Sequence, residues 1–279
     1  MQFIAPGIIF ILLILAFYSI FVEPRRLVVR ELDIYVRGLD ARLSGVRICH
    51  LSDLHFFKHA ANPALLKGIR SRASDLYVIT GDFVHSHAGL SALEELLAVL
   101  KAPVFAVPGN GEYKIPVSSG ELYSLLKKHN VQMLLNKSLN IAVKGATVCV
   151  IGVDDPFTQR DNLCQAMQGA GSHGFCLLLA HSPDVIGDPC ADSVDLILAG
   201  HTHGGQLRPP LWGAVWDHTR LRLGVVDGLF SPQSLSQKTG RKICKTQLFV
   251  NRGMGGRAVR ARFLCPPEVV FITLRQAGV

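Results

Sequence analysis

The chain has 279 residues, of which 49% are hydrophobic and 18% are charged, and its mean hydropathy is +0.30. This composition excludes an intrinsically disordered chain, a collagen-like chain and a small disulfide-stapled scaffold. Glu23 is the only charged residue among the first 24, and the remaining 255 residues have 29 basic and 20 acidic side chains, a net charge of +9. That length is sufficient for one sizeable hydrophobic core.

The chain begins with an apolar segment, Phe3 to Val22, of about the length that crosses the hydrocarbon core of a bilayer. No basic residue precedes it and no small-x-small cleavage site follows, so we interpret it as a retained transmembrane anchor rather than a secretory signal peptide. A buried core helix is the alternative. Because basic residues only follow the segment, we expect the rest of the chain to face the cytoplasm. The arginines concerned are Arg25, Arg26, Arg30, Arg37 and Arg42. We therefore predict an anchor, residues 1–24, and one domain, residues 25–279.

The cysteines and basic residues fit a cytoplasmic domain close to a membrane. The seven cysteines form no Cys-x-x-Cys pair and are odd in number, which suits neither a zinc ribbon nor a complete disulfide framework. Cys49, Cys149 and Cys176 lie in apolar strand-like runs, where a free cysteine behaves as a small hydrophobic residue. No run of five or more basic residues occurs, so we assign the positive charge to membrane proximity and expect no nucleic-acid partner.

Short apolar runs alternate with amphipathic stretches along the rest of the chain, and each run ends in a polar cluster. The predicted strands are Leu27 to Val36, Val46 to Leu51, Leu76 to Thr80, Val104 to Val107, Ala146 to Val153, Phe175 to Ala180 and Leu196 to Ala199. Helices are predicted at Ser91 to Lys101, where leucines recur on one face, and at Ser119 to His129. This alternation predicts an α/β sandwich, and α/β sheets place their sites at the ends of strands.

Seven side chains with metal-binding chemistry follow five of the predicted strands. They are Asp53, His55, Asp82, Asn110, His181, His201 and His203. Asp53 and His55 are one residue apart, so both side chains can point to the same side of an extended turn. A lone histidine at a strand end is ordinarily a capping residue, but the position shared by all seven favours a metal site. Two carboxylates, one amide and four imidazoles suit two adjacent cations that share a carboxylate.

These residues resemble the sequence blocks of the calcineurin-like metallophosphoesterase superfamily, in order, over about residues 45–275. The matching blocks are Asp53-Leu54-His55, Gly81-Asp82, Gly109-Asn110, His181 and Gly200-His201-Thr202-His203. Residues 180–184 (AHSPD), 200–206 (GHTHGGQ) and 262–268 (RFLCPPE) further resemble its membrane-associated bacterial branch. The resemblance implies a metallophosphoesterase-type β-sandwich flanked by helices and preceded by one transmembrane helix. Together with the apolar N-terminal segment and the arginines that follow it, this predicts a single-pass protein of the inner membrane with its catalytic domain in the cytoplasm.

The resemblance also assigns the seven side chains to two divalent metal ions. The first ion is held by Asp53, His55 and His203, the second by Asn110, His181 and His201, and Asp82 bridges them. We further expect Asn110 and His201 to act as catalytic residues. Mixed imidazole and carboxylate ligands suit Mn, Fe or Zn better than Mg or Ca. Two such cations leave a positive pocket for a phosphate group, which a shared hydroxide can attack in line.

The third block departs from the family pattern. In the family it usually reads Gly-Asn-His followed by Asp or Glu, with the histidine on the leaving-group side, whereas residues 109–112 here are Gly-Asn-Gly-Glu. Gly111 cannot donate a proton. Either His85, His87 or His59 supplies the acid, or the leaving group departs as a stable anion, which points to a pyrophosphate or an activated phosphodiester. For His85 and His87, the alternative is a solvated loop.

Residues near the metal blocks suggest a substrate taken from a membrane. Tryptophan and arginine are favoured at lipid headgroups, although a solvated loop with buried tryptophans is the alternative. The residues concerned are Trp212, Trp216, Arg220 and Arg222. Phe56 and Phe57, beside His55, either line an acyl groove or belong to the core.

The preferred function is that of a hydrolase acting on a phosphorylated, lipid-linked substrate such as UDP-2,3-diacylglucosamine. Similar enzymes of lipid A synthesis belong to the superfamily, and some also lack the histidine after Gly-Asn. A broad-specificity metal-dependent phosphodiesterase is one alternative. A catalytically degenerate scaffold for a partner protein is an alternative of another class. The scaffold predicts lost metal ligands, and none is lost here.

Overall fold

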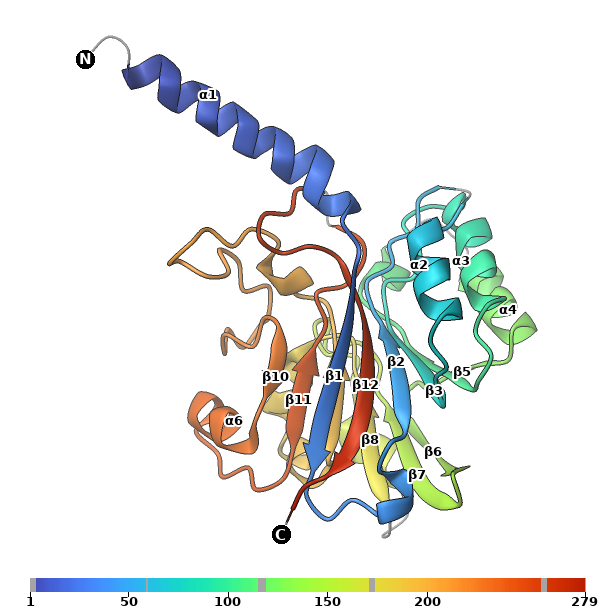
Figure 1. The fold of residues 1–279 in the computed structure, drawn as a ribbon. Helices are drawn as coiled ribbons and strands as arrows, with labels where there is room; N and C mark the ends of the chain where they lie inside the picture. The colour runs from blue at the N-terminus through green and yellow to red at the C-terminus, as the bar shows by residue number, and fades with distance from the viewer. Residues whose placement is uncertain (1–3, 59, 115–118, 171–173, 257–259, 279) are drawn as a thin grey trace.

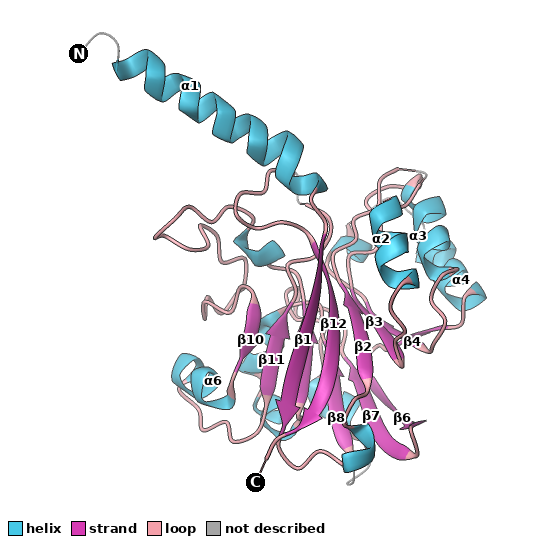
Figure 2. Cartoon of the chain, in the orientation of Figure 1, coloured by secondary structure: helices cyan, strands magenta, loops and turns pink. Residues whose placement is uncertain are grey.

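A computed structural model describes residues 4–58, 60–114, 119–170, 174–256 and 260–278. Two mixed six-stranded sheets pack face to face with helices outside them (Figure 2), which confirms the predicted α/β sandwich. The first sheet has the order β1 (Val28–Val36), β12 (Glu268–Gln276), β2 (Arg47–Leu51), β3 (Leu76–Thr80), β4 (Val104–Val107) and β5 (Val131–Met133). The second has the order β10 (Gly228–Phe230), β11 (Gln247–Val250), β9 (Leu196–Ala199), β8 (Phe175–Leu179), β7 (Ala146–Gly152) and β6 (Lys137–Val143).

Helices cover the outer face of each sheet. Against the first sheet lie α2 (Pro63–Arg70), α3 (Gly89–Leu97) and α4 (Ser119–Lys128), and against the second lie α5 (Leu163–Met167) and α6 (Pro232–Thr239). Strands covered on both sides have continuous apolar sequences rather than alternating ones. In β3 every residue is buried: Leu76 and Val78 face the core between the sheets, whereas Tyr77 and Ile79 face the helices.

The direction of the strands gathers several loops at one edge of the sandwich. In the first sheet β2, β3, β4 and β5 are parallel, and in the second β7, β8, β9 and β11 are parallel. Parallel strands end at the same edge of their sheet, so the segments that follow them are neighbours. These segments contain the seven predicted metal ligands.

The N-terminal segment forms a helix that projects away from the sandwich (Figure 1). Helix α1 (Ile4–Phe17) continues through a π-helical turn, Tyr18–Val22, and a 3₁₀ turn, Glu23–Arg25. The stretch Gly7–Arg25 is long and apolar enough to cross a membrane, and only 6% of it is buried. This exposure argues against a core helix. Length and composition fit either an anchor or a signal sequence.

Buried polar contacts join the end of this helix to the sandwich. The carboxylate of Glu23, which is buried, accepts hydrogen bonds from the backbone N–H groups of Leu264 (2.8 Å) and Cys265. The backbone N–H of Arg262 donates to the carbonyl of Ser19 at 2.8 Å. Ser19 and Glu23 are therefore bonded to the sandwich, although the sequence places Glu23 in the anchor.

Removing the Glu23 carboxylate should destabilise the folded protein. In Glu23→Ala the buried N–H groups of Leu264 and Cys265 lose their acceptor, which should lower the free energy of unfolding by about 2–4 kcal/mol. Urea titration of the full-length protein in detergent measures this change. The control is Glu121→Ala, because Glu121 is exposed and contacts His87; its effect should stay within about 0.5 kcal/mol. Equal effects of the two substitutions would contradict a structural role for Glu23.

Candidate metal centre

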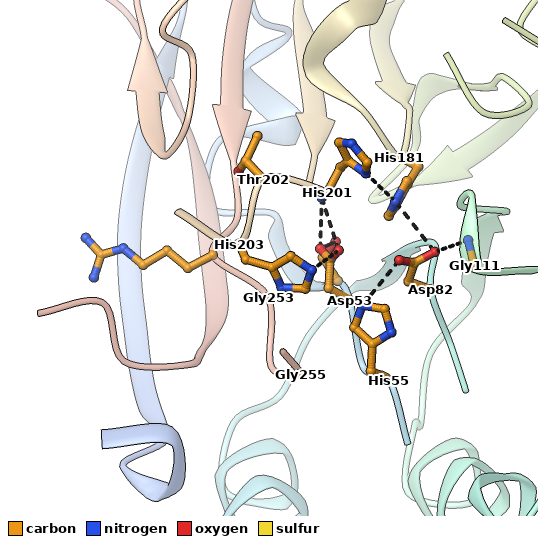
Figure 3. Close-up of polar contacts among 12 residues, drawn as sticks. Asp53, His55, Asp82, Gly111, His181, His201, Thr202, His203, Gly253 and Gly255 are labelled. Carbon is orange, nitrogen blue, oxygen red and sulfur yellow. Dashed lines mark hydrogen bonds and ion pairs between the residues drawn. The ribbon is translucent and has the colours of Figure 1, made fainter. Parts of the chain in front are cut away.

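The loops at the shared edge bring the predicted metal ligands together. Asp53 and His55 follow β2, Asp82 follows β3, Asn110 follows β4, His181 follows β8, and His201 and His203 follow β9. Figure 3 shows the two aspartates at the centre with four histidines around them. The ligand atoms of Asp53, His55 and His203 lie within 4.8 Å of one another, and so do those of Asp53, Asp82 and His181.

Asp53 is held by hydrogen bonds from two loops. Its Oδ2 accepts from Ser52 Oγ at 2.6 Å and from the backbone N–H of His201 at 3.0 Å. His203 Nε2 lies 3.5 Å from Asp53 Oδ1. These contacts therefore hold Asp53, which follows a strand of the first sheet, against the Gly200–His203 turn, which follows a strand of the second.

Asp82 lies between histidines of the two expected metal sites. Its Oδ2 is 3.2 Å from His55 Nε2, and its Oδ1 is 3.6 Å from His181 Nε2. The backbone N–H of Gly111 donates to Asp82 Oδ1 at 2.7 Å. Asp82 therefore contacts one histidine of each expected set.

His181 is oriented by the backbone of the neighbouring sheet. Its Nδ1 lies 2.8 Å from the carbonyl oxygen of Thr80, which can only accept, so Nδ1 is the donor. The lone pair of the neutral imidazole is then on Nε2, which lies 3.2 Å from Asn110 Oδ1 and 3.1 Å from His201 Nδ1. A donor bond from one ring nitrogen to a carbonyl is the usual support of a metal-binding histidine.

The charges of the centre fit divalent cations. Burial opposes protonation of His181, but Asp82 and Asp53 outweigh it and raise its pKa to about 9. Burial raises the pKa of Asp53, whereas His181 and His55 hold the pKa of Asp82 below its usual range despite its burial. In addition, Nδ1 of His55 is buried without a hydrogen-bond partner in the described part of the chain. Two buried acids among imidazoles form a donor set suited to transition metals.

Five of the seven predicted ligands have a left-handed backbone. The φ angles are 50° at Asp53, 43° at His55, 54° at Asp82, 69° at His201 and 52° at His203. Each such conformation costs roughly 1–3 kcal/mol in a non-glycine residue and persists only where surrounding structure imposes it. These five conformations occur where the segments after the strands converge on the candidate site.

Glu112 is a supporting residue that the sequence pattern does not single out. Its carboxylate accepts three backbone N–H groups, from Asp82 (2.9 Å), Phe83 (2.9 Å) and Gly109 (2.7 Å). It therefore ties the loop after β3 to the loop after β4. Its place in the Gly-Asn-Gly-Glu block was the only signal available in the sequence.

Two glycines near the C-terminus also support the centre and were missed. A β-carbon on Gly253 would lie 2.6 Å from Cβ of Asp53, and one on Gly255 would lie 2.6 Å from Cβ of His55. Only glycine allows the backbone to approach these ligands so closely. The Gly-rich stretch 253–256 in the sequence was the available signal.

The histidines considered as alternative acids lie outside this cluster of contacts. The ring of His85 is 6.2 Å from that of His55, centroid to centroid. His87 is exposed and its Nε2 lies 3.2 Å from Glu121 Oε1 on α4. His59 lies outside the described residues. A β-carbon on Gly111 would lie 2.6 Å from Asp82 Oδ1, so a side chain there would displace this ligand.

Comparison with known proteins agrees with this geometry. Residues 46–205, more than half of the chain, match the family of calcineurin-like phosphoesterases. YpbG of Bacillus subtilis is 31% identical over 81% of this chain and 80% of its own length. The phosphodiesterase YaeI of Escherichia coli is 31% identical over 82% of each chain.

A further relative is the UDP-2,3-diacylglucosamine pyrophosphatase LpxG of Chlamydia trachomatis, which is 27% identical over 88% of this chain and 89% of its own length. The matched residues 46–205 include the whole cluster of aspartates, histidines and asparagine described above. The chain therefore belongs to the calcineurin-like phosphoesterase family of metal-dependent hydrolases.

Proposed function

We propose that the protein is a membrane-anchored hydrolase that uses two metal ions to cleave a phosphodiester or pyrophosphate bond. The convergence of two carboxylates, four imidazoles and one amide at one edge of the sandwich is the observation on which this rests. In this assignment Asp53, His55 and His203 hold one ion, Asn110, His181 and His201 hold the other, and Asp82 bridges them. The contacts of Asp82 with His55 and His181 support the bridging role. Mn, Fe and Zn suit this ligand set.

Bound divalent cations would supply Lewis acidity, which lowers the pKa of water and offsets the charge of a phosphate group. The residues of the protein itself fix the orientation of the ligands. Thr80 fixes the ring of His181, and Glu112 fixes the loops of Asp82 and Asn110. We propose that the Asn110 amide and the His201 ring position the phosphate oxygens during the reaction.

The absence of a side chain at Gly111 points to leaving groups that need no acid. Asp82 occupies the space that a side chain at position 111 would need, and the exposed His87 contacts Glu121. We therefore propose that the leaving group departs as a stabilised anion, such as a nucleoside phosphate or a phenolate. His85, the nearest described alternative, remains the residue to test as an acid.

We propose that the substrate is lipid-linked, with UDP-2,3-diacylglucosamine as the leading candidate. One relative has this activity in its name, and the N-terminal helix meets the sandwich beside the loops that follow the metal ligands. The tryptophans of the 208–222 loop are not buried: Trp212 is 82% and Trp216 is 56% exposed. Leu207, just before this loop, pairs with Phe263, whose ring contacts Tyr18 at the helix end. Exposed tryptophans beside an apolar helix are typical of a membrane interface.

A broad-specificity phosphodiesterase is the second candidate, supported by the similarity to YaeI. A catalytically degenerate scaffold for a partner protein is disfavoured, because none of the seven ligands is replaced and each of them contacts another ligand.

We also propose that α1 is a retained anchor in the inner membrane and that residues 25–279 form one cytoplasmic domain. The contacts of Ser19 and Glu23 with residues 262–265 support retention, because cleavage after them would remove a packed part of the sandwich. The five arginines that follow α1 support the cytoplasmic orientation.

Two substitutions distinguish the metal loss caused by removing the bridging ligand from the loss caused by removing a ligand of one ion. Asp82→Ala should abolish hydrolysis and remove more than one equivalent of metal, because it serves both ions. His203→Ala should mainly remove one equivalent. Elemental analysis of the purified variants, measured beside turnover of p-nitrophenyl methyl phosphate, tests this. Near-normal turnover by Asp82→Ala would refute the two-metal assignment.

A leaving-group series tests the role of Gly111. A positioned acid typically contributes about 10²- to 10⁴-fold when the leaving group must be protonated. We expect UDP-2,3-diacylglucosamine and nitrophenyl diesters to be cleaved at least about 10²-fold faster than dialkyl phosphates, measured as kcat/KM in detergent. Efficient cleavage of dialkyl phosphates would instead show that a residue supplies the proton, and its loss in His85→Ala would identify that residue.

A fusion tests the orientation. A reporter that is active only in the cytoplasm, attached after Val279, should give full signal, and one that needs the periplasm should give none. In fractionation the fusion should stay in the inner membrane. Periplasmic signal, or a soluble product shortened by the first 20 or so residues, would overturn the anchor proposal.

A further inference from the structure

A pocket of about 510 Å³ lies between the candidate metal centre and the end of the N-terminal helix. His55 and Gly255 line it on the side of the metal centre, whereas Ile20 and Pro24 line it on the side of the helix. Its volume falls within the roughly 300–1,000 Å³ typical of small-molecule sites. The pocket therefore connects the reaction site with the membrane-facing part of the chain.

The walls of this pocket are mainly apolar. They include Leu54, Phe56, Ala61 and Met254, and the ring of Phe57, which remains 39% exposed. The structure separates the two neighbouring phenylalanines: Phe56 is buried in the core under α3, whereas Phe57 presents its ring to the pocket. An exposed apolar surface beside a polar centre indicates a ligand with an apolar part.

Basic side chains also line the pocket. Arg25, Lys58 and Arg260 line the pocket, and the guanidinium of Arg260 lies 3.2 Å from the centroid of the Phe57 ring. Within the described ranges, no carboxylate lies at salt-bridge distance from any of these three residues. A pocket with apolar walls and cationic groups is complementary to an amphiphile whose head is anionic.

The sheet topology places this pocket beside the end of the N-terminal helix. Strand β1 starts beside the start of β12 (Val28 opposite Glu268), and the end of β2 also lies there (His50 opposite Val270). The helix leads into β1, and the first metal ligands follow β2, so helix and ligands meet at one edge (Figure 1). If α1 spans the bilayer, then Ile20 and Arg25 lie near the lipid headgroups.

We propose that this pocket receives one acyl chain of a lipid-linked phosphoester, which enters from the bilayer beside the end of α1 while its phosphate lies at the metal centre. The inference rests on the proposed hydrolase function and adds to it the route and the subsite of the apolar chain. Phe57, Ala60, Met254 and Ile20 contact the chain, and Arg25, Lys58 and Arg260 attract the anionic head. Selectivity for lipid over soluble phosphoesters is then a property of the pocket rather than of the metals.

Two substrates with the same leaving group isolate this subsite. p-Nitrophenyl dodecyl phosphate and p-nitrophenyl methyl phosphate differ only in alkyl length, so chemistry at the metal centre is the same for both. Each buried methylene strengthens binding by about fourfold. The full-length, Mn-loaded protein in nanodiscs should therefore favour the dodecyl ester by at least tenfold in kcat/KM.

Substitutions in the pocket should reduce this preference. Ala60→Trp fills the pocket from an exposed position, and Phe57→Asp places a charge on its wall. We expect the dodecyl-to-methyl ratio to fall at least tenfold in both. The matched control is Leu139→Asp, because Leu139 is 40% exposed on β6 and does not line the pocket. Partition of the dodecyl ester into the bilayer affects all variants equally, so the change in ratio reports the pocket.

The outcomes distinguish the pocket from the proposed function. If the wild type cleaves both esters and the pocket variants keep its ratio within twofold, the pocket inference is wrong and the hydrolase function stands. If the wild type cleaves neither ester and does not cleave UDP-2,3-diacylglucosamine, the proposed function is wrong. Photolabelling then still tests whether the pocket binds an alkyl chain. A dodecyl phosphate with a terminal diazirine should label residue 20 or residues 54–63 in the wild type. The same probe should not label them in Ala60→Trp. If Ala60→Trp does not reduce the labelling, the pocket inference is wrong.

Discussion

Asp53 and Asp82 are two carboxylates buried side by side where the ends of the two sheets meet, and the rest of the site follows from that burial. A buried carboxylate is tolerated only if hydrogen bonds and positive charge compensate for its lost hydration. Asp53 obtains them from Ser52 and His201, and Asp82 from Gly111 and the neighbouring imidazoles. Backbone N–H groups reach these acids only because the loops turn sharply after each strand. The left-handed conformations of the ligands are the consequence.

A second set of buried contacts links this centre to the N-terminal helix. Arg262 is fully buried and donates to the carbonyls of Arg252, Gly253, Gly255 and Cys265. It thereby holds the glycine stretch against the loop that contains the first two metal ligands. The backbone of the same 262–265 segment bonds to the end of the helix. The end of the helix, the glycine stretch and the first metal ligands are thus held close together, and the apolar pocket lies between them.

The sequence predicts the interior of this fold better than its edges. The seven predicted strands agree with the structure within one residue at each end, because strands buried on both faces are continuous apolar runs. β5, β6 and β10 were missed, since β5 and β10 have three residues each and β6 is largely exposed, with polar residues in its first half. The short β11 was also missed. β12 contains a recognisable apolar run from Val269 to Leu274, although it is absent from the predicted set.

For the site, residue types and their positions after strands were sufficient to nominate ligands but not to describe their surroundings. No pattern in the sequence reports that Asp82 closes the space at Gly111 or that Glu112 accepts three N–H groups, because these depend on how two loops meet. The exposure of Trp212 likewise depends on tertiary packing, and the sequence left it undecided. The pocket is formed by three segments far apart in the chain, so only the folded structure reveals it.

The number and coupling of bound ions test the central claim most directly. Metal-free protein loaded with Mn²⁺ should bind two equivalents, and its electron paramagnetic resonance spectrum should show two manganese ions coupled through a shared ligand. This result is expected because Asp82, the proposed bridging ligand, lies between His55 of one set and His181 of the other. A single equivalent with the six-line spectrum of an isolated Mn²⁺ ion would contradict the two-metal account.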